Sequence, residues 1–280
     1  MIYINFKNID VMGVADTGGS SGGTTIDVAQ DRIKLTKSEF ETVPSYFDFS
    51  NCTDVTSMFE NCSNLHTISL ILDKCANADK LCYNCTSLDN AEINLPNAIN
   101  VEYLFSDCRL LRTANVYVAA ATNVANLFGS CSNLETVNDL DLTSATSANN
   151  LFYMSQENTK LKKVILNNTA NITRFNLAFR NCVGLEELNE INATSMTSII
   201  NPFYNCTSLT SFGGFKDLKI SLNISHATAL TADSLMNVIN QAKDLSIESK
   251  TATLTLGTTN ISKLTEEQIA IATAKGWTLA

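Results

Sequence analysis

The feature that most constrains this chain is a repeat of about 23 residues, which the stretch from Val124 to Ser147 shows most clearly. Three columns of residues recur in it. The aromatic column contains Phe59, Cys82, Phe105, Phe128, Phe152, Phe179 and Phe203. Three residues later comes a cysteine column of Cys62, Cys85, Cys108, Cys131, Ser155, Cys182 and Cys206. The leucine column contains Leu65, Leu88, Leu111, Leu134, Leu161, Leu185 and Leu209. Self-similarity at this period is typical of a solenoid, in which each repeat stacks on the next.

Each repeat divides into two halves with different periodicities. After the leucine, apolar residues alternate, as in Ala114, Val116 and Val118, which predicts a strand. Before the cysteine they recur every three or four residues, which indicates a short helical or 3₁₀ turn. Successive strands would pair in parallel about 4.8 Å apart. The sequence therefore predicts an α/β solenoid with one parallel sheet and short helical or 3₁₀ turns on its other face.

The cysteine column indicates packing and not cross-linking. Six of the nine cysteines occupy this one column, where a small apolar side chain suits a stacked interior. An odd total without a recognisable secretion signal favours reduced, buried thiols. Cys82 and Cys85 have the spacing of a redox or half-zinc motif, but both lie on repeat columns and no second such pair exists.

The chain is expected to contain four parts. Residues 1–25 form an anchor strand and a Gly/Ser linker, residues 26–47 an N-terminal cap, residues 48–225 the solenoid of about seven turns, and residues 226–280 a C-terminal α/β cap. Longer repeats indicate extra loop residues at 156–159 and 173–177.

The first segment alternates apolar residues as a strand does, at Ile2, Ile4, Phe6, Ile9 and Val11. A flexible linker, residues 16–25, follows it. Two interpretations remain open. The strand folds back over the end of the solenoid, or it docks on another protein by strand addition and acts as an assembly anchor.

The C-terminal part changes character. Leu235, Val238 and Ile239 share one helical face after Thr231, a suitable N-cap. Residues 251–256 alternate as a strand, residues 265–268 have a capping-box pattern, and Gly276 suits a helix C′ position. Residues 277–279 are expected to pair beside the 251–256 strand.

Composition and charge exclude several function classes. The net charge is −9 without a basic cluster, which argues against nucleic-acid binding. The apolar runs are too short to span a bilayer, and the N-terminus lacks a signal peptide, so synthesis and folding in the cytoplasm are expected. Two histidines leave little for a catalytic triad or a metal site. We expect no cofactor and no enzymatic activity.

Several columns together resemble the BspA-like leucine-rich repeats, whose 23-residue pattern runs A-F-x-x-C-x-x-L-x-x-I-x-L-P. The segments beginning at Leu127 and at Leu81 match it well, and the second extends to Leu95-Pro96. The resemblance covers about residues 48–223, and the C-terminal part looks like the tails of such proteins in gut bacteria and their bacteriophages. It implies adhesion and binding without catalysis.

A binding surface would consist of the outward-pointing strand residues. Counted from each leucine, they are Ser69, Ile71, Glu92, Asn94, Asn115, Tyr117, Asp139, Asp141, Ile165, Asn167, Glu190 and Asn192. Tyr117 and Ile71 are the apolar anchors of a surface that suits a protein or a glycan. Asp139 and Asp141 also fit a glycosidase pair, but solvated strand positions explain them better.

The favoured function is a phage virion appendage or decoration protein, made in the host cytoplasm and attached to other virion proteins by its N-terminal segment. The alternative is an adhesin on the bacterial cell surface. A host-surface protein or glycan is the expected contact, and homo-oligomerisation is left open.

Overall fold

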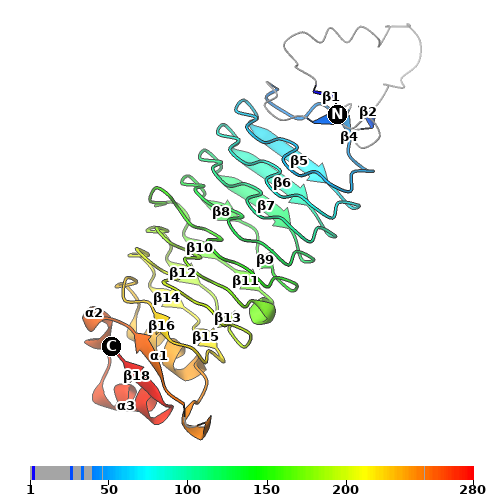
Figure 1. The fold of residues 1–280 in the computed structure, drawn as a ribbon. Coiled ribbons are helices and arrows are strands. Elements are labelled where there is room, and N and C mark those ends of the chain that lie inside the picture. The colour runs from blue at the N-terminus through cyan, green and yellow to red at the C-terminus, as the bar shows by residue number, and fades with distance from the viewer. Residues whose placement is uncertain (1, 4–25, 28–32, 35–39, 46, 249) are drawn as a thin grey trace, which may run out of the picture.

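The computed structural model describes residues 2–3, 26–27, 33–34, 40–45, 47–248 and 250–280. The chain runs through successive turns that stack into an elongated body, with a small domain of helices and strands at its C-terminal end (Figure 1). We number the turns by the leucine column, from turn 1 at Leu65 to turn 7 at Leu209.

The first three turns contribute full strands, β5 (Thr67–Ile71), β6 (Asn90–Asn94) and β7 (Thr113–Tyr117). They pair in parallel with each residue opposite the one 23 positions later. Buried residues alternate with residues that are exposed or half-buried, as predicted, because successive side chains of a strand point to opposite faces.

From turn 4 onward each strand is divided into two short pieces. These are β8 (Thr136–Val137), β9 (Leu140–Asp141), β10 (Lys163–Val164), β11 (Leu166–Asn167), β12 (Glu187–Leu188), β13 (Ile191–Asn192), β14 (Ser211–Phe212) and β15 (Phe215–Lys216). They form separate parallel ladders, ordered β10-β12-β14, β11-β9 and β13-β15, while β8 joins β5, β6 and β7. The prediction of one continuous sheet is therefore wrong, although the parallel pairing is confirmed.

One extra residue in the strand segment explains the division. In turn 4 the side-chain amide of Asn138 accepts from the Val116 N–H at 2.8 Å and donates to the Val116 carbonyl at 3.0 Å. In turn 6 the Asn189 amide likewise accepts from the N–H and donates to the carbonyl of Leu166, with both distances 2.9 Å. A side-chain amide thus replaces a peptide group wherever a turn with the extra residue follows a turn without it.

Turn 7 carries glycine at the equivalent position, Gly213. A Cβ there would lie 2.3 Å from the Glu190 backbone nitrogen, so no other residue fits without a shift. Turns 6 and 7 both contain the extra residue, and the Gly213 N–H bonds directly to the Leu188 carbonyl at 3.1 Å. Direct backbone hydrogen bonding therefore joins these two turns, without a bridging side-chain amide.

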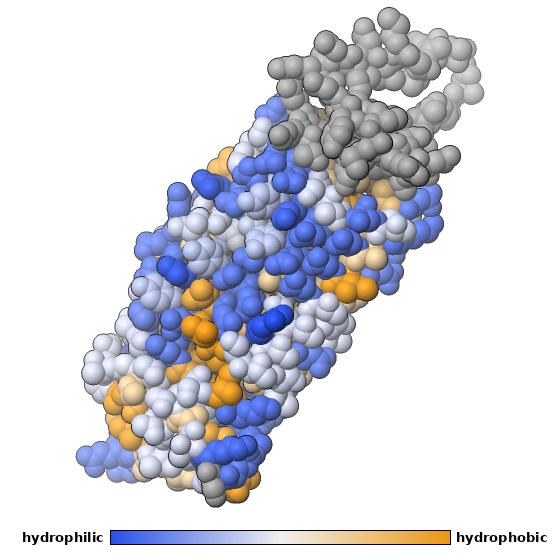
Figure 2. Space-filling view, viewed as in Figure 1, coloured by the Kyte–Doolittle hydropathy of each residue, from blue (hydrophilic) through white to orange (hydrophobic). Residues whose placement is uncertain are grey.

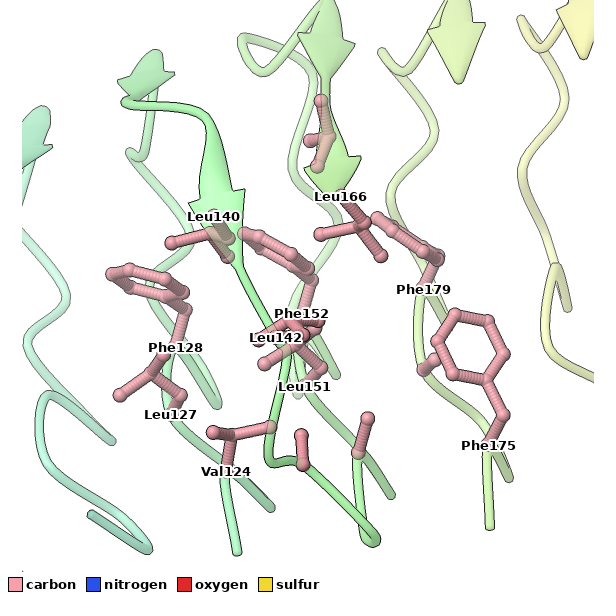
Figure 3. Close-up of a cluster of buried hydrophobic side chains, with 14 of the residues drawn as sticks. Val124, Leu127, Phe128, Leu140, Leu142, Leu151, Phe152, Leu166, Phe175 and Phe179 are labelled. Carbon is pink, nitrogen blue, oxygen red and sulfur yellow. The ribbon is translucent and has the colours of Figure 1, made fainter. Parts of the chain in front are cut away.

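The three repeat columns form the core. All seven residues of the aromatic column are fully buried, and Phe105, Phe128, Phe152 and Phe179 stack with ring centroids 5.1 to 5.7 Å apart. Figure 3 shows Phe128, Phe152 and Phe179 following one another between the strands and the opposite wall. Because each turn buries its apolar side chains only against its neighbours, the core exists only in the stack.

The cysteine column is buried as predicted, and all nine cysteines are free thiols. The thiols of Cys85, Cys131 and Cys206 donate to the carbonyls of Phe59, Phe105 and Phe179 at 2.9 to 3.2 Å. Cys108 and Cys182 make the same bond to the residue of the aromatic column in the preceding turn. A thiol therefore both fills the column and satisfies a backbone carbonyl, which alanine could not do.

Turn 5 departs from the predicted alignment. Asn158, which is fully buried and lies three residues before Leu161, occupies the place of the cysteine. Its amide donates to the carbonyls of Cys131 and Leu134 at 3.2 and 3.0 Å and accepts from the N–H groups of Lys160 and Leu161. Ser155, which is exposed, does not belong to the column. The extra residues therefore precede Asn158.

The predicted position of the second insertion, residues 173–177, is also wrong. The backbone of Arg174 bridges to Ser147 and Ser198 in regular register, so the segment 173–177 is not a loop. The extra residue of turn 5 accompanies the 3₁₀ helix η2 (Thr169–Asn171), which follows β11.

The wall opposite the strands consists of hydrogen-bonded turns, so the prediction of helical or 3₁₀ turns before each cysteine is wrong. The N–H groups of Ser57, Phe59 and Asn61 bond to carbonyls of the next turn at 2.9 Å. In this ladder the backbone is left-handed at positions four residues apart, such as Ser57 and Asn61. Asn61 has φ 60°, and asparagine recurs there in other turns because it tolerates this conformation.

Short parallel pairs precede turn 1. Strand β1 (Ile2–Tyr3) pairs with β3 (Ile33–Lys34), and β2 (Ile26–Asp27) pairs with β4 (Phe47–Asp48). Phe40 then packs edge-on against Phe59, with ring centroids 6.2 Å apart.

The C-terminal part closes the other end. It contains β16 (Leu222–Asn223), α1 (Ala232–Gln241), η3 (Ser246–Glu248), β17 (Ala252–Thr255), α2 (Thr258–Ile261), α3 (Glu266–Ala274) and β18 (Trp277–Leu279). The N-cap Thr231, the capping box of Thr265 and Gln268, and the pairing of β17 with β18 are confirmed.

Helix α1 covers the last strand edge of the stack. The Ser234 hydroxyl accepts from the Phe212 N–H at 3.1 Å and donates to the Thr210 carbonyl at 2.9 Å. The Asn237 amide donates to the Phe212 carbonyl at 3.1 Å. These bonds satisfy the edge of β14, which would otherwise be available for pairing with another strand.

We expect the native protein to be inert toward thiol reagents. Burial raises the pKa of the thiols of Cys82, Cys108, Cys131, Cys182 and Cys206, and the thiolate is the reactive form. Ellman's reagent should detect all nine thiols in denaturant and essentially none in the native state. Rapid reaction of several thiols without denaturant would contradict this packing.

Replacing Asn158 by alanine should lower the free energy of unfolding by about 3 kcal/mol or more, because buried backbone partners would remain unsatisfied. Asn133→Ala is the matched control. Asn133 makes one exposed bond to the Arg109 carbonyl, so its loss should cost below about 1 kcal/mol. Urea unfolding followed by circular dichroism measures both, and equal losses would refute the role of Asn158.

Candidate functional site

The candidate site is the outer side of the strand ladders, which we call the sheet face and define by the twelve predicted residues from Ser69 to Asn192. In turns 1 to 3 the structure brings two of their columns together. Ser69, Glu92 and Asn115 are aligned across the strands, as are Ile71, Asn94 and Tyr117. Parallel pairing places aligned residues about 4.8 Å apart.

The remaining predicted residues continue the face, although the extra strand residue of turn 4 displaces their alignment with turns 1 to 3. Asp141 is aligned with Asn167, and Asn192 is aligned with Lys216. Asp139 and Glu190 are exposed and directly follow Asn138 and Asn189, whose amides bridge the ladders. Ile165 is half-buried between β10 and β11. The ladders thus bring all twelve residues onto one side of the stack, but not into one pocket.

Two side chains stand out from this polar surface. Ile71 is 68% exposed and Tyr117 is 51% exposed, and Asn94 separates them. On the side seen in Figure 2, hydrophilic residues cover most of the stack and hydrophobic ones gather in small patches. Ile71 and Tyr117 are therefore the candidate apolar contacts of an otherwise polar strand surface.

Shallow hollows lie between the columns. One, of about 320 Å³, is lined by residues of β5, β6 and β7, including Ser69, Glu92 and Asn115. Another, of about 410 Å³, lies over β11 and β13 and includes Asn167, Glu190 and Asn192 among its lining residues. Their walls combine hydroxyl, amide and carboxylate groups with apolar side chains such as Ile68 and Leu166.

Asp141 is the most fully hydrogen-bonded carboxylate of the sheet face. It accepts from the Thr143 hydroxyl at 2.6 Å, from the Thr143 N–H at 3.0 Å and from the Asn168 amide at 3.0 Å. The bonds from Thr143 and Asn168 favour the charged form and lower the pKa of Asp141.

Sequence reasoning missed a second set of residues, which we call the charged rim. It is the column one residue after the leucine in turns 1 to 6 and contains His66, Asp89, Arg112, Glu135, Lys162 and Glu186. Charge alternates along it, and neighbouring turns are joined by ion pairs. Arg112 bonds to Asp89 through two nitrogens, and Lys162 lies 2.7 Å from Glu186. The alternation of sign was visible in the sequence.

The predicted assembly anchor is described only in part. Ile2 lies in β1 and is aligned with Ile33 of β3, within the segment predicted as the N-terminal cap. Ile4, Phe6, Ile9 and Val11 lie outside the described residues. The choice between a folded-back strand and a docking strand therefore remains a prediction for most of the segment.

In the described part of the chain, no helix is long and apolar enough to cross a membrane. The same residues contain no group of three or more His, Cys, Asp or Glu side chains placed to hold a metal ion.

One protein-family model matches residues 35–117 and 122–232, which is more than half of the chain. Its description is "Mycoplasma protein of unknown function, DUF285". The chain belongs to this family. Membership in the DUF285 family assigns no activity, and no curated protein matches the chain.

Two solved structures are similar to this DUF285 protein. A leucine-rich cell-surface protein from Faecalibacterium prausnitzii A2-165 is 17% identical over 76% of this chain and 72% of that one, with a TM-score of 0.32. A leucine-rich repeat protein from Bacteroides ovatus is 14% identical over 85% and 83%, with a TM-score of 0.21. These TM-scores are too low to support a conclusion about function.

We expect the pKa of Asp141, followed by carboxyl carbon NMR during acid titration, to lie below its usual value of about 3.9. Replacing Asn168 by alanine removes one donor to the carboxylate and should raise this pKa. Asn133→Ala, distant on the repeat, should leave it unchanged. An Asp141 that titrates normally, or is insensitive to Asn168, would contradict the hydrogen-bonded geometry.

Proposed function

We propose that this DUF285 protein is a non-enzymatic binding protein that contacts a macromolecule through its sheet face. The observation that carries the proposal is the in-register placement of exposed Ile71 and Tyr117 within a regular polar surface. Aromatic and apolar side chains in a polar surrounding are the usual anchors of a protein or glycan contact.

The acidic residues of the face support binding better than hydrolysis. A glycosidase needs one carboxyl group with a raised pKa to act as general acid. The pKa of Asp141 is lowered instead by the hydrogen bonds from Thr143 and Asn168, so Asp141 does not fit the role of that general acid. The hollows of the sheet face are open and shallow, and a binding face requires no more than that.

We further propose display on the bacterial cell surface as the place of action. Immunolabelling of intact producing cells tests this location. A virion appendage, attached by its N-terminal segment, is the rival that the sequence raised. It would instead place the protein in purified particles and lose it from them when residues 1–25 are deleted.

Binding is tested by probing defined arrays of glycans and extracellular proteins with the labelled chain. The double variant Ile71→Ser/Tyr117→Ser removes both anchors, and Leu110→Ser is the control because Leu110 is 52% exposed outside the face. We expect the double variant to bind the captured ligand at least about tenfold more weakly, while the control binds like the wild type.

All three proteins should unfold at similar urea concentrations, because the replaced side chains are exposed. A ligand that binds the double variant as tightly as the wild type would refute the sheet face as the contact surface. Hydrolysis of an arrayed glycan would refute a purely binding role.

A further inference from the structure

Apolar and acidic residues alternate from turn to turn on the sheet face. Turns 1, 3 and 5 carry Ile71, Tyr117 and Ile165. The turns between them carry carboxylates, with Glu92 in turn 2, Asp139 and Asp141 in turn 4, and Glu190 in turn 6. Over turns 1 to 6 the face therefore has a period of two turns, although the backbone repeats at every turn.

Among the described residues, the carboxylates of the face differ from those of the charged rim in having no cation beside them. On the rim, Asp89, Glu135 and Glu186 each pair with a lysine or arginine. In the described part of the chain, no lysine, arginine or histidine nitrogen lies within 4.0 Å of the carboxylates of Glu92, Asp139, Asp141 or Glu190. The stack neutralises its rim and leaves the face negative.

The distance over which charge and apolar residues repeat along the stack restricts the spacing of the groups on a partner. Two turns of parallel strands advance about 10 Å. Seven residues of an α-helix advance about 10.5 Å, and three residues of a polyproline II helix advance about 9.3 Å. Either regular polypeptide can place cations opposite the even turns and apolar side chains opposite the odd turns.

We propose that the partner is a basic polypeptide segment that lies along the stack axis, with Lys or Arg recurring about every 10 Å and apolar residues between them. Its cations meet the carboxylates of turns 2, 4 and 6, and its apolar side chains contact Ile71, Tyr117 and Ile165. This inference rests on the sheet face being the binding surface, as proposed above, and it names the partner class.

Other occupants fit the charges less well. A neutral glycan would cover four carboxylates without supplying a cation, which carries a desolvation cost. A nucleic acid or an acidic glycan would be repelled. A second copy would bring its own carboxylates against this face, and like charges across an interface are costly.

The test uses synthetic peptides and the full chain. One probe is a helical 22-residue peptide with Lys at every seventh position and Leu midway between. A second is a proline-rich 15-residue peptide with Lys at every third position. In the charge-reversed controls Glu replaces each Lys. Binding is measured by isothermal titration calorimetry at low and physiological salt.

Two variants with the same charge change locate the contact. The face variant is Glu92→Gln/Asp141→Asn/Glu190→Gln, and the rim variant is Asp89→Asn/Glu135→Gln/Glu186→Gln. We expect at least one Lys peptide to bind, the face variant to weaken it by about tenfold or more, and the rim variant to change it less than about twofold. The Glu peptides should not bind.

Three outcomes would overturn the inference: neither Lys peptide binds, the face and rim variants weaken binding equally, or the Glu peptides bind as well as the Lys peptides. The proposed function is judged separately. If an arrayed ligand requires Ile71 and Tyr117 but is indifferent to the face variant, the face binds a partner that is not basic. If no ligand requires either set, both proposals fail.

Discussion

The structure depends on hydrogen bonding between equivalent backbone positions of consecutive turns. On the strand side the bonds join parallel strands in register. On the opposite wall they join N–H groups to carbonyls of the next turn, with left-handed residues four positions apart in the chain. With both walls held at one spacing, equivalent side chains must lie directly above one another. The recurrence of Phe, Cys and Leu follows from that geometry, since a side chain that fits one turn fits the next.

The same constraint explains the exceptions. A turn that gains a residue breaks the ladder, and the broken bonds must be replaced because buried peptide groups without partners are costly. Asn138 and Asn189 replace them with side-chain amides, Gly213 allows the backbones to meet, and Asn158 fills a cysteine position while satisfying four backbone groups. Asparagine thus repairs the stack where its length varies.

The repeat columns predicted the core, the parallel strands and the buried thiols, because apolar residues recur in the sequence at the positions that are buried in every turn. The alignment failed at Ser155, since counting forward from Phe152 crosses an insertion, whereas counting back from Leu161 reaches Asn158. The helical turns were misjudged because a spacing of three or four residues also fits a chain of left-handed and right-handed residues. The division of the sheet depends on one extra residue in the strand segments of turns 4, 6 and 7, which a period of about 23 residues conceals.

For the candidate site, the alternation of apolar and polar residues predicted which strand residues point outward. It did not predict that their carboxylates lack the ion pairs found on the charged rim. The contrast between paired and unpaired carboxylates appears only when neighbouring turns are set side by side. Three rim carboxylates are neutralised along the stack, and four on the face are not. The charges available to a partner are therefore the face carboxylates that have no lysine or arginine of the described chain beside them.

The stacking of turns in register is measured most directly by spin-label distances along one column of the face. Pulsed electron resonance on labelled cysteines at Asn94 paired with Asp141, Asn192 or Lys216 samples separations of two, four and five turns. The account predicts narrow distributions whose means increase by about 4.8 Å per turn, to roughly 19 Å at four turns and 24 Å at five. Distances that do not increase with turn number, or broad distributions for every pair, would contradict it.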